Sequence, residues 1–261
     1  MVQQTRTGFQ TLVNNQPGVG QEGDFADANL RAVVNAGPGG FIASATRSPI
    51  VGHFAWGDQN PADFAAAEVS GQTGIGTGGQ ALGSYQGETT TEIGFVAGRA
   101  VNTVITAFLA DATLVLAPGM LATLFNEGGF WAKFAAGATP GQKVFAKYID
   151  GEPVAAAAGT STQTATSSAA SLANTGVLTV GGSLTGTFHV GDVVNFTVDG
   201  HSMAITAQLS GTAGGAGTYQ TSLTGVTIGS AAVTAADRVE TAFSVDTPAL
   251  AGELAKISTW G

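Results

Sequence analysis

Residues 143–151 read KVFAKYIDG, and this stretch indicates the fold class most clearly. In a β-strand, side chains alternate between two faces. The alternation would place Lys143, Phe145, Lys147 and Ile149 on one face and Val144, Ala146 and Tyr148 on the other. Asp150-Gly151 is a dipeptide typical of a tight hairpin turn. We therefore predict a strand that ends in a hairpin.

Further strand patterns lie on both sides of this stretch. Residues 91–95 and 239–245 alternate between apolar and other residues, and residues 254–260 have the pattern of a terminal strand. Residues 41–43 and 50–56 are rich in apolar and aromatic residues. The sequence Glu127-Gly128-Gly129 predicts a hairpin that joins strands at 120–125 and 130–134. The pattern as a whole predicts an all-β protein.

The composition changes between residues 155 and 237. Residues 155–173 consist almost wholly of Ala, Ser, Thr, Gly and Gln, which is typical of a linker. Residues 174–236 contain only two charged residues, Asp192 and Asp199, and Asp199-Gly200 predicts a hairpin. A two-residue turn would pair Val198 with His201, Phe196 with Met203 and Val194 with Ile205. We expect a core of residues 1–155 plus 239–261, interrupted at 156–238 by a linker and a small inserted β domain.

Charge and hydropathy exclude several classes of partner. Only 10% of the 261 residues are charged, against roughly 25% in ordinary soluble domains, and the net charge is −9. Nine cations cannot form the dense basic surface that a phosphate backbone requires, so we expect no direct nucleic-acid binding. The acidic balance also argues against binding to anionic membranes. Residues 104–125 are apolar but contain Asp111 and Pro118-Gly119, which predicts two strands and a turn rather than a membrane span.

Few residues suggest catalysis or a cofactor. The chain has no cysteine, and His53, His189 and His201 lack the spacing of metal ligands. A GxGxxG match at residues 74–79 has no strand before it and no helix after it, so we interpret it as a loop. We expect no catalytic, cofactor or metal site, and no enzyme activity.

Aromatic residues in loop-like or terminal segments are the candidates for a protein interface. Aromatic side chains often anchor such interfaces, although each could instead cover the protein's own core. The candidates are Phe9, Phe25, Trp56, Phe64 and Trp260.

A set of short motifs occurs in a characteristic order along the chain. They are Gly8-Phe9, Pro17-Gly18-Val19, residues 23–26 (GDFA), Asn29 with Arg31, 36–41 (AGPGGF), 51–56 (VGHFAW), 118–120 (PGM), 129–132 (GFWA), 141–144 (GQKV) and 251–260 (AGELAKISTW). This ordered set resembles the structural cement (capsid decoration) proteins of tailed phages, over roughly residues 8–155 and 239–261. Leu30 departs from the pattern, because the family resemblance leads us to expect proline there.

The resemblance implies a jelly-roll-like β-sandwich and a structural role in the virion. The protein would be made in the cytoplasm of a bacterial host and would bind the outer face of an HK97-type capsid, bridging neighbouring copies of the major capsid protein. It would be a homodimer, with a trimer as the alternative. Two other functions stay open: a virion module that adheres to host cells or glycans, and a tail or baseplate component.

Overall fold

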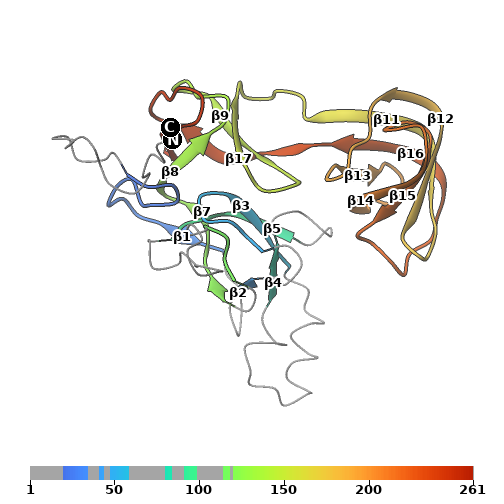
Figure 1. Cartoon of the computed structure of the whole chain (residues 1–261), viewed down its shortest axis with the longest axis horizontal. Coiled ribbons are helices and arrows are strands. Elements are labelled where there is room, and N and C mark those ends of the chain that lie inside the picture. The colour runs from blue at the N-terminus through green and yellow to red at the C-terminus, as the bar shows by residue number, and fades with distance from the viewer. Residues whose placement is uncertain are drawn as a thin grey trace, which may run out of the picture.

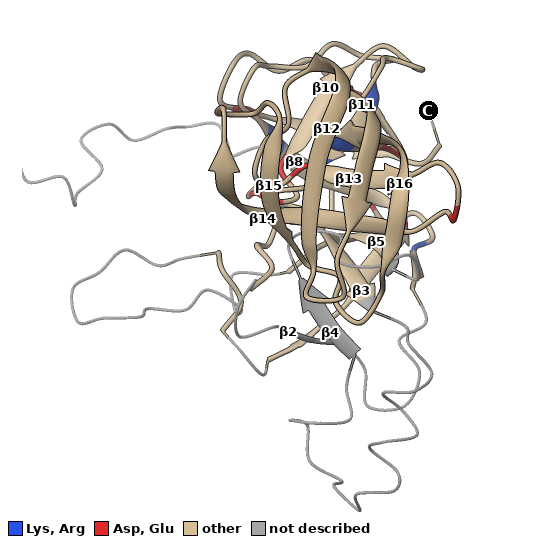
Figure 2. Ribbon diagram, turned by 90° about the vertical axis from the view of Figure 1, so that its right-hand side faces the viewer, with Lys and Arg blue, Asp and Glu red and all other residues tan. Residues whose placement is uncertain are grey.

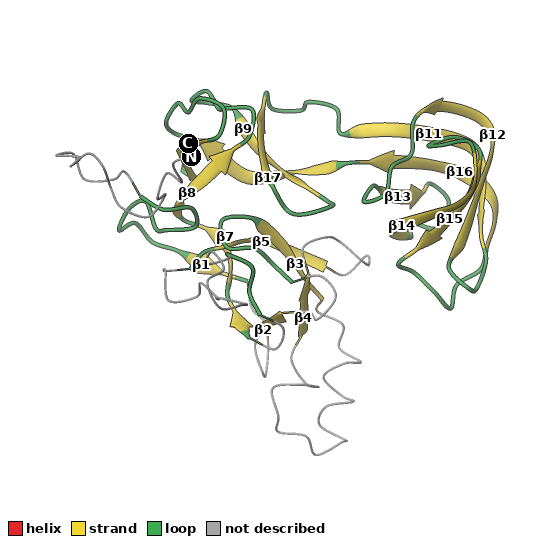
Figure 3. Ribbon diagram, in the orientation of Figure 1, coloured by secondary structure: helices red, strands yellow, loops and turns green. Residues whose placement is uncertain are grey.

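The computed structural model describes residues 20–34, 41–43, 48–58, 80–83, 91–98, 114–117 and 120–260. These residues form strands and connecting loops without a helix, which confirms the prediction of an all-β protein (Figure 3). The described residues form no helix that could cross a membrane. The strands form a five-stranded sheet, a seven-stranded sheet and a closed barrel.

The five-stranded sheet is built from two distant parts of the chain. All of its strand pairs are antiparallel, and their order is β10-β9-β17-β18-β8. The predicted strand at residue 143 and the hairpin turn at Asp150-Gly151 are both present. The strands are β8 (Gly129–Phe134), β9 (Lys143–Lys147), β10 (Pro153–Ala156), β17 (Arg238–Val245) and β18 (Glu253–Ser258).

The seven-stranded sheet has the order β1-β7-β5-β3-β4-β2-β6. Only Thr123 separates β6 from β7, yet β6 lies at one end of the sheet and β7 next to the other end. The sheet must therefore curl, so that β6 and β7, which are adjacent in the chain, can lie near its two opposite ends. Its strands are β1 (Ala32–Val33), β2 (Phe41–Ala43), β3 (Phe54–Asp58), β4 (Gln80–Gly83), β5 (Thr91–Val96), β6 (Leu121–Ala122) and β7 (Leu124–Glu127).

The two sheets pack face to face through an aromatic cluster. Phe54 and Phe95 come from the curled sheet, whereas Phe130 and Phe243 come from the five-stranded sheet. The Phe95 and Phe130 ring centroids lie 5.0 Å apart, and all four side chains are buried. Aromatic contacts of this kind add to the free energy gained by burying apolar surface. We call these two sheets the sandwich core.

The barrel is a separate closed structure with its own interior. Its strand order is β11-β12-β15-β14-β13-β16, and β11 also pairs with β16 to close it. The interior contains Phe188, Phe196 and Tyr219 among smaller apolar residues. Its strands are β11 (Gln163–Leu172), β12 (Val177–Gly186), β13 (Val193–Phe196), β14 (Ser202–Gly211), β15 (Gly217–Thr221) and β16 (Ile228–Ala236).

The barrel is joined to the sandwich core by two neighbouring chain segments. Only Asp237 separates β16 from β17, and its N–H donates to the Thr162 carbonyl oxygen at 3.2 Å. Figure 1 shows the barrel displaced to one side of the two sheets, at the end of this connection. Val193 and Ala204 of the barrel belong to the same buried cluster as Tyr148 of the core. The barrel is therefore packed against the core as well as tethered to it.

Three local predictions are wrong. The predicted hairpin at Glu127-Gly128-Gly129 does not form, because β7 joins the curled sheet and β8 joins the five-stranded sheet. Gly128 has a φ of +139°, a conformation that favours glycine and redirects the chain between the sheets. The predicted linker at 155–173 contains β11, whose small side chains Ala165 and Ala170 are buried in the barrel.

The third wrong prediction is the register of the hairpin at Asp199-Gly200. Val194 pairs with Met203 rather than with Ile205, which shifts the register by two residues. The loop is longer than predicted because the Gly200 N–H donates to the Phe196 carbonyl oxygen. A shift of two residues keeps each side chain on its predicted face. Val198, however, falls in the loop and is 73% exposed.

The alternation predicted for β9 is also incomplete. Phe145 was placed on a face with two lysines, but its side chain is fully buried. The guanidinium carbon of Arg238 lies 5.7 Å from the centroid of its ring. More of this strand is therefore buried than its amphipathic pattern predicted.

Candidate functional site

The structure places the five candidate interface aromatics in different environments. Phe9 and Phe64 lie outside the described residues. Trp56 is 3% exposed and packs against Tyr148, with 5.7 Å between ring centroids. Phe25 is half-buried among Phe125 and Phe130. Among the candidates that the structure describes, Trp260 has the most accessible side chain, which is 52% exposed.

An extended N-terminal segment covers one edge of the sandwich core. We call residues 20–27 the strap. The Gly23 N–H donates to the Trp131 carbonyl oxygen at 2.8 Å, and the Trp131 N–H donates back to Asp24 at 2.9 Å. The Ala26 N–H donates to Gly129 at 2.9 Å. These bonds satisfy the outer edge of β8, which would otherwise be free to pair with another chain.

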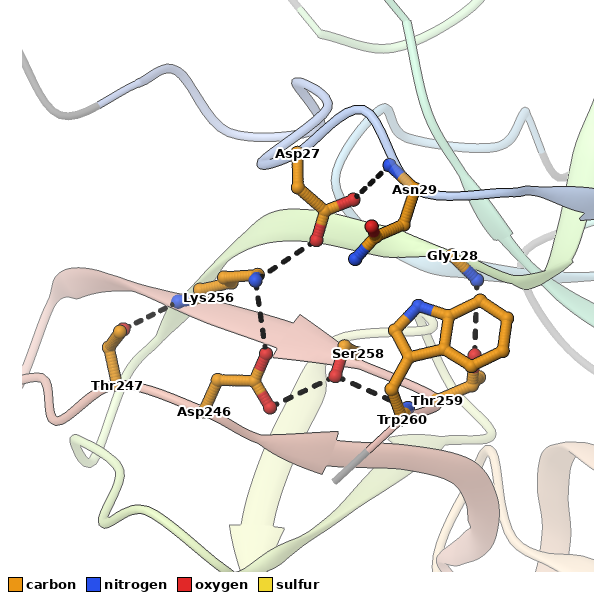
Figure 4. A network of polar contacts seen from close by, with 9 residues as sticks. All are labelled: Asp27, Asn29, Gly128, Asp246, Thr247, Lys256, Ser258, Thr259 and Trp260. Carbon is orange, nitrogen blue, oxygen red and sulfur yellow. Dashed lines mark hydrogen bonds and ion pairs between the residues drawn. The ribbon is translucent and has the colours of Figure 1, made fainter.

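A network of charged and polar groups fixes the strap to the C-terminal strand (Figure 4). Lys256 Nζ lies 2.9 Å from Asp27 Oδ2 and 3.4 Å from Asp246 Oδ2. The Ser258 hydroxyl donates to Asp246 Oδ1 at 3.0 Å. One lysine thus connects the strap to both strands of the C-terminal hairpin.

The pKa values of this network favour the charged forms. Burial alone would raise the pKa of the Asp27 carboxyl, but the Lys256 ammonium, the Asn29 N–H and the charge of Arg31 together lower it. The hydrogen bond to Asp27 is the main reason why the pKa of Lys256 is raised, against the opposing effect of burial. The ion pair therefore persists throughout the neutral pH range.

Two residues that adjoin this network in the chain, Leu30 and Trp260, have exposed apolar side chains. The Thr259 N–H donates to the Gly128 carbonyl oxygen at 3.3 Å, which positions the neighbouring Trp260. A Cβ atom on Gly128 would lie 2.8 Å from Arg31 Cγ, so Arg31 is close to the same point. Leu30 is 85% exposed and Val33 is 51% exposed. We use the name Trp260 patch for Leu30, Val33 and Trp260, three exposed apolar residues of the sandwich core.

The Trp260 patch has the features of a protein contact surface. A tryptophan side chain is a frequent anchor of protein interfaces. β1 carries Val33 and ends the curled sheet, so its outer edge pairs with no described strand. Sequence reasoning found Trp260 but missed Leu30 and Val33. The departure at Leu30 from the expected proline was the available signal.

The described residues offer little to a metal ion. Within them, no three His, Cys, Asp or Glu side chains lie together in a way that could hold one. His189 Nδ1 lies 3.5 Å from Asp192 Oδ2, but Asp192 already accepts hydrogen bonds from the Thr164 hydroxyl and the His189 N–H. The absence of catalysis stays a prediction.

The comparison with protein families gives a match that covers most of the chain. Residues 9–195 match the family model of the XM1 gp53 minor capsid protein. The match covers well over half of the chain and ends within β13 of the barrel. A search of curated proteins found no match. The chain belongs to the XM1 gp53 minor capsid protein family and is a structural protein of the phage capsid.

Proposed function

We propose that this protein is a capsid cement protein, which binds the outer surface of the major capsid protein lattice and bridges neighbouring subunits. Membership of a minor capsid protein family supports a position on the shell. The Trp260 patch is the structural observation that supports adhesion, since it leaves a tryptophan and two aliphatic side chains exposed. The low charge of the chain also favours broad protein contacts, whose central regions are poor in charge.

Such binding would stabilise the shell by linkage. Packaged DNA repels itself and pushes the subunits apart. A protein that binds across subunit boundaries prefers the assembled shell, and its binding free energy adds to the stability of that state. Many copies in a lattice strengthen the effect through multivalency.

The test is a binding experiment with capsids that lack the protein. We expect the purified protein to sediment with mature capsids, to show little affinity for dissociated coat subunits, and to raise the temperature at which the shells release DNA. Trp260→Ala should weaken binding by about 30-fold, as expected for an anchoring tryptophan worth about 2 kcal/mol. Equal affinity for free subunits and capsids would contradict the bridging function.

We also propose that the barrel is an insertion into a core of residues 1–155 plus 239–261. The hydrogen bond between Asp237 and Thr162 supports this division, because it holds the two connecting segments side by side. Deletion of residues 160–236 should leave capsid binding intact. If binding persists but adsorption to host cells falls, the barrel serves the alternative function of adhesion.

One observation limits the adhesion alternative. Sugar-binding surfaces commonly stack carbohydrate rings on exposed aromatic side chains, yet Phe188, Phe196 and Tyr219 are each at most 2% exposed. Figure 2, in which the barrel faces the viewer, also shows almost no charge on its strands. Capsid binding through the sandwich core is therefore the function that we favour.

A further inference from the structure

A polar pocket opens at the surface of the sandwich core, beside the strap. It has a volume of about 420 Å³, which is in the range of pockets that hold small ligands or side chains. The strap, the start of β3, the end of β8 and the loop before β10 meet there. The residues that line it are Glu22, His53, Lys133, Ala135, Glu152 and Gly252.

The hydrogen bonding of His53 defines what this side chain presents to the pocket. His53 Nδ1 lies 3.0 Å from the Asp150 carbonyl oxygen, which can only accept a hydrogen bond. Nδ1 therefore carries a proton, and Nε2 of the neutral ring is an acceptor. Nε2 faces Glu22 Oε1 at 3.6 Å, which is too long for a hydrogen bond. In the neutral form of the ring two acceptors therefore face each other, whereas a protonated ring forms an ion pair with Glu22.

Glu22 is held in place although its charge is poorly compensated. Its side chain is 18% exposed. Within the described residues, no hydrogen-bond donor lies at bonding distance from its carboxylate. Burial raises the pKa of Glu22 and Glu152 adds to this effect, while the charge of His53, when its ring is protonated, and that of Lys133 oppose it. A Cβ atom on Gly52 would lie 2.2 Å from Glu22 Cγ, so only glycine leaves room for this rotamer.

The other charged groups leave Glu22 in need of a cation. Glu152 already forms an ion pair with Lys147. Lys133 is exposed and lies at the rim, so it can turn toward solvent. A half-buried carboxylate gains free energy when a bound donor forms hydrogen bonds with it.

We infer that this pocket receives an arginine side chain of the major capsid protein, whose guanidinium donates to the Glu22 carboxylate and to His53 Nε2. The inference rests on the proposed capsid binding and identifies one contact that would contribute to that binding. A guanidinium has five N–H donors and no acceptor, which matches the two facing acceptors. The rim is suited to a protein partner, because Ala135 and Gly252 are exposed and the nearby Leu250 is 73% exposed.

The first experiment tests the chemistry of the pocket on the full-length protein. Nα-acetyl-arginine methylamide is titrated into ¹⁵N-labelled protein, and the amide signals of Gly52, His53 and Gly252 are followed by NMR. We expect saturable shifts in the millimolar range, weaker shifts with the lysine analogue, and none with the uncharged citrulline analogue. Glu22→Gln should abolish the shifts without loss of stability, because its amide can donate to His53 Nε2. Equal shifts with arginine and citrulline would overturn the inference.

The second experiment tests the partner. Glu22→Gln should weaken binding to capsids at least tenfold, whereas Asp199→Asn, which removes the same charge from an exposed barrel turn, should bind as the wild type does. If both variants bind equally well, the pocket inference fails and the cement function stands. If the wild type itself does not bind capsids, the cement function fails, and a saturable arginine titration would still establish a guanidinium site.

Discussion

The sandwich core and the barrel build their interiors from different residues. In the core, Phe25, Phe54, Phe95, Phe125, Phe130 and Phe243 form a chain of ring contacts between two sheets. In the barrel, alanine and aliphatic side chains fill a closed ring of strands around three aromatic residues. The core also leaves sheet edges that need covering, whereas the barrel pairs every strand on both sides.

The two parts also differ in the surface features that they expose. Exposed sheet edges, the strap, the Trp260 patch and the polar pocket beside Glu22 all belong to the sandwich core. The barrel residues 174–236 contain only Asp192 and Asp199 as charged groups, and Asp192 is buried. All three tryptophans, Trp56, Trp131 and Trp260, lie in the core, so tryptophan fluorescence reports on the core alone.

The largest effect is expected from opening the aromatic cluster. Phe130 contacts the rings of Phe25, Phe95, Phe125 and Phe243, and it is fully buried. Phe130→Ala should lower the free energy of unfolding by about 4 kcal/mol. Urea denaturation followed by tryptophan fluorescence measures the change. Phe196→Ala is the matched barrel variant, and it should shift far-UV circular dichroism more than fluorescence; equal shifts would show that core and barrel unfold as one unit.

A second comparison uses two glycines with nearly the same backbone conformation. Gly151 has a φ of +72° and Gly200 a φ of +70°. A Cβ atom on Gly151 would lie 1.8 Å from the Phe54 carbonyl oxygen, whereas one on Gly200 would meet nothing within 4 Å. Gly200→Ala should cost about 1 kcal/mol from backbone strain alone. Gly151→Ala should cost about 3 kcal/mol or more, since the turn must also move; similar thermal shifts for both variants would contradict this.

The ion pair of the strap should make the core sensitive to acid. The pKa of Asp27 in the folded protein is below its unfolded value of about 3.9. The stabilisation is therefore complete above that value and is lost as the pH falls through the folded pKa. Asp27→Asn should lower stability by about 1 kcal/mol at pH 7. The difference from the wild type, measured by fluorescence-detected urea unfolding at a series of pH values, should shrink to nothing in acid; a constant difference would mean that charge is not the cause.

The smallest stability effects are expected at exposed apolar residues. Trp260 of the core and Val198 of the barrel are 52% and 73% exposed, respectively. Alanine at either position should change the free energy of unfolding by no more than about 0.5 kcal/mol. Capsid binding should nevertheless fall for Trp260→Ala and stay unchanged for Val198→Ala. A loss of binding in both variants would place the barrel in the interface.

Local patterns in the sequence predicted much of the sandwich core. The strand at residue 143, the Asp150-Gly151 turn and the final strand all depend on neighbouring residues, and all three are present, although the alternation within the first of them is incomplete. The crossing at Gly128 could not be predicted, because a Glu-Gly-Gly sequence suits a hairpin as well as a change of sheet. The packing of Gly128 against Arg31, which is distant in the sequence, becomes visible only in the folded structure.

The candidate site was less predictable than the fold. Exposure of Trp260 and burial of Trp56 are results of tertiary packing, which no local pattern reveals. Residues 155–173 have the composition of a linker, yet their small side chains suit a strand that pairs on both sides inside a barrel. Glu22 and His53 are far apart in sequence, so their convergence also required the structure.

Closure of the barrel has a consequence for crowded assemblies. A strand edge with free N–H and carbonyl groups can recruit a neighbouring strand, and crowding favours such pairing. The barrel closes through β11 and β16 and offers no edge of this kind. Copies held at high density would therefore not pair edge to edge through the strands of their barrels.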